Sequence, residues 1–441
     1  MVMDSPNKNR VSTVSNHTVK SSQNHPTAGR RHLTPFDLAS MKIKYIHYGL
    51  LYKKPIASSI SNLLSSFSKT LDLFHPLSGR LVTTNHDDNT IFISLDFTNE
   101  GAEFIHASAP SVSIHDFTSD GPDISDFFSL IDLIGLDGID HPLLAAQVTE
   151  LADGLFIACA FNHAVADGAS AWHFINTWSF YSRCTNNENA LLVSLPDFEL
   201  WFIDSCPLPI RLPINFTDRS GPVSDVSTYA VENRIFYFSA EHVASLKARA
   251  SERVQVSTLQ AVLAHAWKAI TRARKLKPED STILIVIVGY RTRKLNPAVP
   301  EGYFGNIGNG VGIRETAKEL KEESLGKTAM RVKKAISGRG EEEVYKWVRA
   351  WSENPVTHEG DPETGNVVLM GESNRFDIYG NDFGWGKPIG FRYGWPKRKV
   401  NSGFVKIVTG KEEGSVELDV ALREGVMRAL LEDEEFMAVV G

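Results

Sequence analysis

The chain has 441 residues, of which 42% are hydrophobic and 22% charged, and its formal net charge at pH 7 is -7. These values are typical of globular proteins and exclude collagen-like, coiled-coil and wholly disordered chains. Because acidic residues outnumber basic ones and the two kinds alternate along the chain, nucleic acid is not an expected partner.

The three cysteines, Cys159, Cys184 and Cys206, form no CxxC motif and are odd in number. This pattern favours reduced thiols in a cytoplasmic protein over a disulfide framework or a cysteine-based zinc site. The protein is also expected to be a monomer. The histidines form no HxxxH or HExxH motif, so no metal site is expected. The longest apolar stretch, 283–288, is too short to span a membrane, and no secretory signal follows the first residue.

Residues 1–31 are polar and contain a single acidic residue, Asp4. This composition predicts a disordered N-terminal tail, with an organelle transit peptide as the alternative. Apolar spacing then predicts a helix over 57–74 and, after Gly168, a helix that ends near residue 183. Strands are predicted at 81–84, 90–96 and 155–161, and together these elements make a first domain over 32–184.

Four prolines crowd a short segment after this domain, at positions 207, 209, 213 and 222. Such density suits an extended connection, so we expect a long crossover linker over 185–228 and a second domain over 229–441.

The second domain repeats the alternation of strands and helices. Ser239 is a plausible N-cap after a strand at 234–238, and residues 257–260 form a capping-box pattern ahead of another helix. The β-branched run 282–288 is typical of a strand covered on both faces. The remaining predicted elements are two charged amphipathic helices and three strands, at 315–336, 341–352, 365–370, 404–409 and 415–420. The sequence therefore predicts an α/β protein with two domains.

His163 follows the apolar strand 155–161 and precedes a small-residue turn that ends at Gly168. A polar side chain at such a strand end can stand over a cavity, and a neutral imidazole there can accept a proton from a nucleophile. A hydrogen-bonded structural histidine is the alternative. Asp167 has two open roles, because it can orient the imidazole or hold the turn by pairing with a distant cation.

A second candidate region is the loop 381–388, which contains Asp382, Gly384, Trp385 and Gly386. Two glycines beside two aromatic residues form a tight loop that suits a hinge or packing role better than direct chemistry.

Arg291 and Arg293 leave the end of the most apolar strand. A guanidinium so close to a core requires a carboxylate partner, for which Asp167 and Asp382 are the candidates. Two solvated arginines are the alternative.

These residues resemble a known family. Residues 163–168 match the HxxxDG signature and residues 382–386 the DFGWG signature of the plant BAHD acyltransferases. Further segments are similar to the family along almost the whole chain from residue 33, at 33–38, 74–81, 147–149 and 291–306.

The resemblance implies two chloramphenicol-acetyltransferase-like domains, with mixed β-sheets flanked by helices and the active site in a channel between them. It implies transfer of an acyl group from acyl-CoA to an alcohol or, as a second choice, an amine, without a permanently bound cofactor. His163 would be the general base, and Asp167 would point away from it and bind Arg291. The DFGWG loop would be structural and near the CoA side, and Asp382 could meet an arginine.

One segment departs from the family pattern. Hydroxycinnamoyl-transferring members tend to have a tryptophan just before DFGWG, whereas residues 372–376 contain none. Ser373 and Asn374 are the candidate oxyanion donors in its place. Two alternatives to acyl transfer are a lyase-type cleavage of an ester-like adduct and a catalytically idle binding protein.

Overall fold

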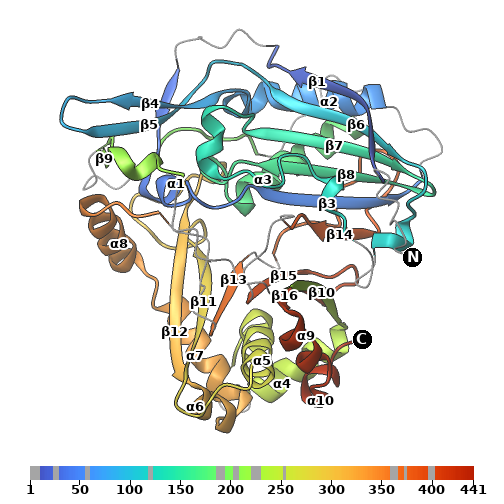
Figure 1. Ribbon diagram of the computed structural model, residues 1–441, viewed down its shortest axis with the longest axis vertical. Coiled ribbons are helices and arrows are strands. Elements are labelled where there is room, and N and C mark those ends of the chain that lie inside the picture. The colour runs from blue at the N-terminus through green and yellow to red at the C-terminus, as the bar shows by residue number, and fades with distance from the viewer. Residues whose placement is uncertain are drawn as a thin grey trace, which may run out of the picture.

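The computed structural model describes residues 10–22, 29–54, 60–117, 123–184, 194–201, 208–219, 230–251, 255–357, 366–371, 375–395 and 403–441. Strands and helices alternate in two domains, one above the other in Figure 1, with the blue-to-green half of the chain above and most of the yellow-to-red half below. The predicted α/β fold, with two domains whose mixed sheets are flanked by helices, is confirmed. Within the described ranges, no helix is both long and apolar enough to cross a membrane.

The first sheet has six strands in the order β1-β6-β7-β8-β3-β14, and β8 is buried along its whole length. The sheet is mixed because β6 and β7 are parallel while the other neighbours are antiparallel. The strands are β1 (Ser12–Val19), β3 (Ile46–Lys53), β6 (Ala102–Ala109), β7 (Leu144–Leu151), β8 (Gly154–Phe161) and β14 (Gly390–Tyr393). Helices α2 (Ile60–Leu73) and α3 (Gly168–Arg183) pack together beside this sheet, since Phe67 of α2 contacts both Phe104 of β6 and Trp178 of α3.

The prediction of a disordered tail over 1–31 is wrong for residues 10–22 and 29–31. β1 pairs with β6 from Ser12 opposite Ser108 to Val19 opposite Ala102. Only Val19 is buried in this edge strand, so its sequence is polar and lacks the alternation by which half-buried strands are found. Arg31, farther along, is also buried in the first domain.

A smaller sheet extends the first domain, in the order β2-β5-β4 with β9 beside β5. Its strands are β2 (Arg30–His32), β4 (Arg80–Asn85), β5 (Thr90–Asp96) and β9 (Leu212–Pro213). β9 lies in the predicted crossover, so part of that segment runs along the first domain. The short helices are α1 (Pro35–Ala39), η1 (His75–Ser78), η2 (Ile114–Phe117), η3 (Ser125–Phe127), η4 (Gly135–Ile139) and η5 (Ile214–Thr217).

The second sheet has six strands in the order β10-β16-β15-β13-β11-β12, with β13 parallel to both of its neighbours. These are β10 (Val231–Phe238), β11 (Ser281–Gly289), β12 (Gly308–Thr316), β13 (Val367–Gly371), β15 (Phe404–Thr409) and β16 (Val416–Arg423). The helices of this half are α4 (Ala240–Ala250), α5 (Thr258–Ala273), α6 (Ala317–Glu322), α7 (Leu325–Ser337), α8 (Glu341–Glu353), α9 (Glu424–Leu431) and α10 (Glu434–Met437). Ser239 and the capping box at Ser257 begin α4 and α5 as predicted. The helix predicted over 315–336 is two helices, because Thr316 and Ser324 cap α6 and α7 separately.

The prediction that strand 282–288 is covered on both faces is wrong. Thr282 of β11 accepts a hydrogen bond from the indole nitrogen of Trp267 on α5, at 3.0 Å, so this face lies against the helices. Val286 and Val288 share the face and are buried, whereas Ile287 points the other way and is 44% exposed. Helices therefore cover one face of this sheet and leave the other open at β11.

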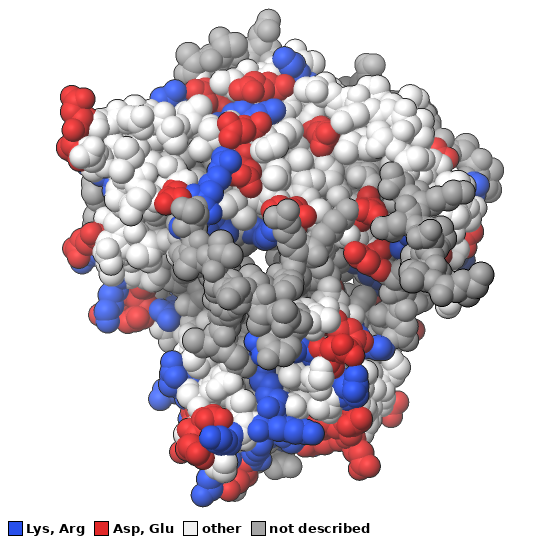
Figure 2. All heavy atoms as spheres, in the orientation of Figure 1, with Lys and Arg blue, Asp and Glu red and all other residues white. Residues whose placement is uncertain are grey.

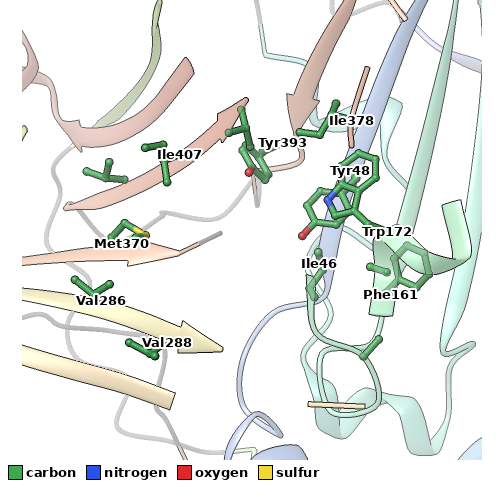
Figure 3. Packing of buried hydrophobic residues seen from close by; sticks show 14 of the residues in the cluster. Ile46, Tyr48, Phe161, Trp172, Val286, Val288, Met370, Ile378, Tyr393 and Ile407 are labelled. Atoms are coloured by element: carbon green, nitrogen blue, oxygen red, sulfur yellow. The ribbon is translucent and has the colours of Figure 1, made fainter. Parts of the chain in front are cut away.

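A strand from the second half of the chain completes the first sheet. β14 pairs with β3, with Tyr393 opposite Tyr48, so the predicted second domain over 229–441 needs correction at residues 390–393. The linker limits at 185 and 228 stay predictions. One hydrophobic cluster spans both domains, and Figure 3 shows Tyr393 between Ile407 of the second sheet and Tyr48 of the first.

Candidate active site

His163 stands directly after β8, where the side chain of Asn162 fixes the turn. Asn162 is fully buried, and its Oδ1 accepts from the backbone N–H of Ala164 at 2.9 Å. Its Nδ2 donates to the carbonyl of Gly135 at 2.8 Å and to the hydroxyl of Tyr45 at 2.9 Å. These bonds hold the backbone on either side of His163 and thereby fix the position of its imidazole. The His163 side chain is partly exposed.

A second set of contacts holds the backbone carbonyl of His163. Asn306 donates from its side-chain Nδ2 to this carbonyl at 2.8 Å. Asn306 is in turn held by Asp37, whose Oδ1 accepts from its backbone N–H at 2.9 Å and from Nδ2 at 3.0 Å. Asp37 is fully buried in α1, with the Arg31 guanidinium 3.8 Å from its other oxygen. Asp37 and Asn306 are thus positioning residues that the sequence reasoning missed, although both lie in segments that carried the resemblance.

Asp167 is occupied by groups other than the imidazole. Its Oδ2 forms an ion pair with Arg291 and accepts from the N–H of Ile307 at 3.3 Å, while its Oδ1 accepts from the N–H of Ser170 at 3.0 Å as the N-cap of α3. Arg291 also donates to the carbonyl of Gly305 at 2.7 Å. Burial raises the pKa of the Asp167 carboxyl, but Arg291 and the hydrogen bonds with Ser170 together outweigh this effect and leave the pKa below its ordinary value. The carboxylate therefore ties the turn after β8 to the segment before β12.

The imidazole of His163 is kept neutral by its surroundings. Burial is the main cause that lowers its pKa below the ordinary value, and the positive charge of Lys406 acts in the same direction. Its own carbonyl and the Asp167 carboxylate oppose this shift but do not cancel it. Nδ1 is buried without a hydrogen-bond partner among the described residues.

Among the described residues, Asp382 has no arginine partner. Asp382 Oδ1 instead accepts from the backbone N–H groups of Gly384 and Gly386, at 2.8 and 2.9 Å. Both glycines have positive φ, 111° and 105°, which explains why glycine is needed there. Arg293 donates to the carbonyl of Ile336 at 2.8 Å. Of the two nominated carboxylates, only Asp167 thus binds a nominated arginine in the part of the chain described here.

The DFGWG loop is anchored on the first domain. Phe383 is fully buried against Trp178 of α3, with ring centroids 4.9 Å apart, and its carbonyl accepts from the Ser182 hydroxyl at 2.8 Å. Trp385 stacks on Phe383 and meets the edge of Tyr52 on β3. These contacts support a structural role for the loop, whereas its predicted nearness to CoA stays a prediction.

The oxyanion candidates Ser373 and Asn374 lie outside the described residues. Among the residues that are described, no group of three or more His, Cys, Asp or Glu side chains is placed to hold a metal ion.

Comparison with known proteins decides the family. Residues 9–437 match the family model described as "Transferase family". An uncharacterized acetyltransferase of Arabidopsis thaliana is 36% identical over 425 residues, which cover 93% of this chain and 94% of the relative. The BAHD acyltransferase DCR of the same plant is 32% identical over 450 residues, covering 93% and 90%. The chain belongs to the BAHD acyltransferase family.

Solved structures agree with this membership at the level of the fold. Vinorine synthase matches with a TM-score of 0.73 and 19% identity, over 98% of each chain. F. sporotrichioides TRI101, in complex with coenzyme A and T-2, matches with a TM-score of 0.72 and 18% identity, over 94% of this chain and 99% of that one. The BAHD architecture thus extends over nearly the whole chain.

The pH dependence of this BAHD acyltransferase should report the lowered pKa of His163. A base whose pKa lies below 6.5 is deprotonated at neutral pH, so kcat/KM should be flat there and fall only as the pH drops below 6.5. The measurement is kcat/KM between about pH 4.5 and 9, with melting temperatures at each pH as the control. A loss of activity centred above pH 6.5 in folded protein would contradict it.

Proposed function

We propose that the protein transfers an acyl group from acyl-CoA to a hydroxyl group of a plant metabolite, with His163 as general base and no covalent acyl-enzyme. An amine is the second choice of acceptor. The proposal also includes a monomeric cytoplasmic enzyme that uses acyl-CoA as a co-substrate and keeps no cofactor between turnovers.

The observation that carries the proposal is the state of His163. Its imidazole is neutral and partly exposed, its backbone is held by Asn162 and Asn306, and the nearby carboxylate of Asp167 is occupied by Arg291. A neutral imidazole held in this way is suited to remove a proton from an alcohol. Figure 2 shows acidic and basic side chains interspersed over this face of both domains. TRI101, which shares this fold, forms a complex with coenzyme A and T-2, and this supports the use of acyl-CoA by the present chain.

The chemistry follows from this placement. Nε2 of His163 takes the proton of the acceptor hydroxyl as its oxygen attacks the thioester carbon, and the carbonyl electron pair moves onto oxygen. The oxyanion requires hydrogen-bond donors, for which Ser373 and Asn374 are our candidates. Collapse of the tetrahedral intermediate breaks the carbon–sulfur bond, and the imidazolium returns the proton to the CoA thiolate. Binding both substrates at one place supplies much of the acceleration.

A thiol-release assay tests the proposal. Acetyl-, benzoyl- and p-coumaroyl-CoA are each combined with a plant metabolite extract and with single alcohols and amines, and acylated products are identified by mass spectrometry. We expect CoA release that depends on both an acceptor and His163. Release without an acceptor, or no release with any pair, would instead favour a hydrolytic or lyase-type reaction or an idle binding protein.

A further inference from the structure

Lys406 and Asp419 lie opposite each other on neighbouring strands, on the face of the second sheet that the helices leave uncovered. They are partners in the register of β15 and β16. Their neighbours Ile407 and Leu418 are fully buried and point to the opposite face of the sheet. Trp395, which follows β14 of the first sheet, donates from Nε1 to Asp419 Oδ2 at 3.0 Å. The pair therefore faces the first domain.

The Lys406 ammonium lies over two aromatic rings of that facing segment. Nζ is 4.0 Å from the ring centre of Tyr393 and 4.4 Å from that of Trp395, which is the geometry of cation–π contacts. Its charge also lowers the pKa values of His163 and His47. Lys406 therefore lies where the second sheet meets the β14 segment that completes the first sheet.

Asp419 is a buried carboxylate with an unused oxygen. The residue is 6% exposed, and while Oδ2 is bound by Trp395, Oδ1 is buried and has no hydrogen-bond partner among the described residues. Burial raises its pKa to about 6, with Lys406 and the Trp395 bond acting against the shift, so the group is mainly ionised at neutral pH. A buried acceptor without a donor is costly, and the cost is larger when the acceptor is charged. A donor supplied by a ligand would remove this cost.

The charges around Asp419 Oδ1 indicate which kinds of ligand group can bind to it. Glu417 lies two residues before Asp419 on β16, and its Oε1 accepts from the Tyr379 hydroxyl at 3.2 Å. Arg392 of β14 donates to the carbonyls of Phe117 and Phe391, and its charge acts on both carboxylates without an ion pair to either among the described residues. The free position on Asp419 is therefore an acceptor, which excludes an anionic group and selects a hydroxyl or amino group.

We infer that Asp419 and Lys406 form an anchoring subsite for the acyl acceptor, in which Asp419 Oδ1 accepts a hydrogen bond from a second hydroxyl or amino group of that molecule. The inference rests on the proposed function and names its substrate class: the acceptor is a diol or an amino alcohol, and not a simple mono-alcohol. Lys406 is a positioning residue that keeps the carboxylate ionised and fixes it beside Tyr393 and Trp395.

The test measures equilibrium binding in the His163→Ala variant, so that it does not depend on turnover. Calorimetry compares two matched pairs of probes, tyrosol with 2-phenylethanol and hexane-1,6-diol with hexan-1-ol, which differ by one hydroxyl. We expect the dihydroxy probe to bind at least about 10-fold more tightly in at least one pair, as for a site built to pair with a hydroxyl. Equal binding within both pairs, or no binding of any probe, overturns the inference. Absence of CoA release in the earlier assay would count against the proposed reaction and leave this result standing.

Two variants locate the effect. Asp419→Leu removes the hydrogen-bond acceptor and should abolish the preference for the dihydroxy probe, whereas Asp419→Asn removes only the charge and keeps an amide that can still pair with a hydroxyl. Glu413→Leu, in the exposed turn that joins β15 to β16, is the control and should leave the preference unchanged. A preference that survives in folded Asp419→Leu protein would also overturn the inference.

Discussion

Replacing His163 with alanine should lower kcat by about 10²–10⁴-fold, which is the usual contribution of a positioned general base. The fold should be unaffected, because the ring nitrogen Nδ1 makes no hydrogen bond within the described structure and the bond from Asn306 goes to the backbone carbonyl. The measurement is CoA release with the best substrate pair, together with thermal denaturation.

The control for this prediction is His17→Ala, which removes an exposed imidazole on β1. It should leave both rate and melting temperature unchanged. If folded His163→Ala protein kept a kcat close to that of the wild type, another group would have to take the proton.

Replacing Asp167 with asparagine should destabilise the protein by about 3 kcal/mol and lower activity with it. The reason is that Arg291 would lose its charged partner at a site where both side chains are largely buried, with side-chain exposures of 19% for Asp167 and 21% for Arg291. Arg291 would still donate to Ser170 and Gly305, but its charge would be uncompensated. Urea denaturation measures the free energy of unfolding.

A double-mutant cycle with Arg291→Gln supplies the control for this pair. If the ion pair is the reason for the loss, the two changes together should cost much less than the sum of the single changes. Unchanged stability with a shifted pH–rate profile would instead mean that Asp167 acts directly on the imidazole. The structure favours the first outcome, since the Asp167 oxygens are bound to Arg291, Ser170 and Ile307.

The segment from β8 to the start of α3 could be predicted because its residues are adjacent in the sequence. A continuous apolar run followed by a histidine and a small-residue turn specified β8, His163 and the start of α3 within a few residues. The pairing of Arg291 with Asp167 came from the resemblance, whereas the residue pattern alone left the choice between Asp167 and Asp382 open. Sequence alone could only require that a buried guanidinium has some partner.

The remaining features depend on contacts between distant segments. Asp37 and Asn306 are 269 positions apart, so no pattern in the sequence joins them. β1 is polar because it lies at a sheet edge with both faces mostly exposed, which removes the alternation that identifies strands. β11 carries apolar residues on both of its faces, so its sequence does not distinguish them. Only the coordinates show that helices cover one face and leave the other open.

β14 belongs to the second half of the chain but pairs in the first sheet, and this affects how the protein folds and moves. Residues 390–393 reach the far edge of a sheet whose other strands end by residue 161. An N-terminal fragment that emerges from the ribosome therefore exposes the unpaired backbone of β3, a ready edge for self-association, until most of the chain has been made. The same pairing of β14 with β3 restrains the two domains against a large hinge motion.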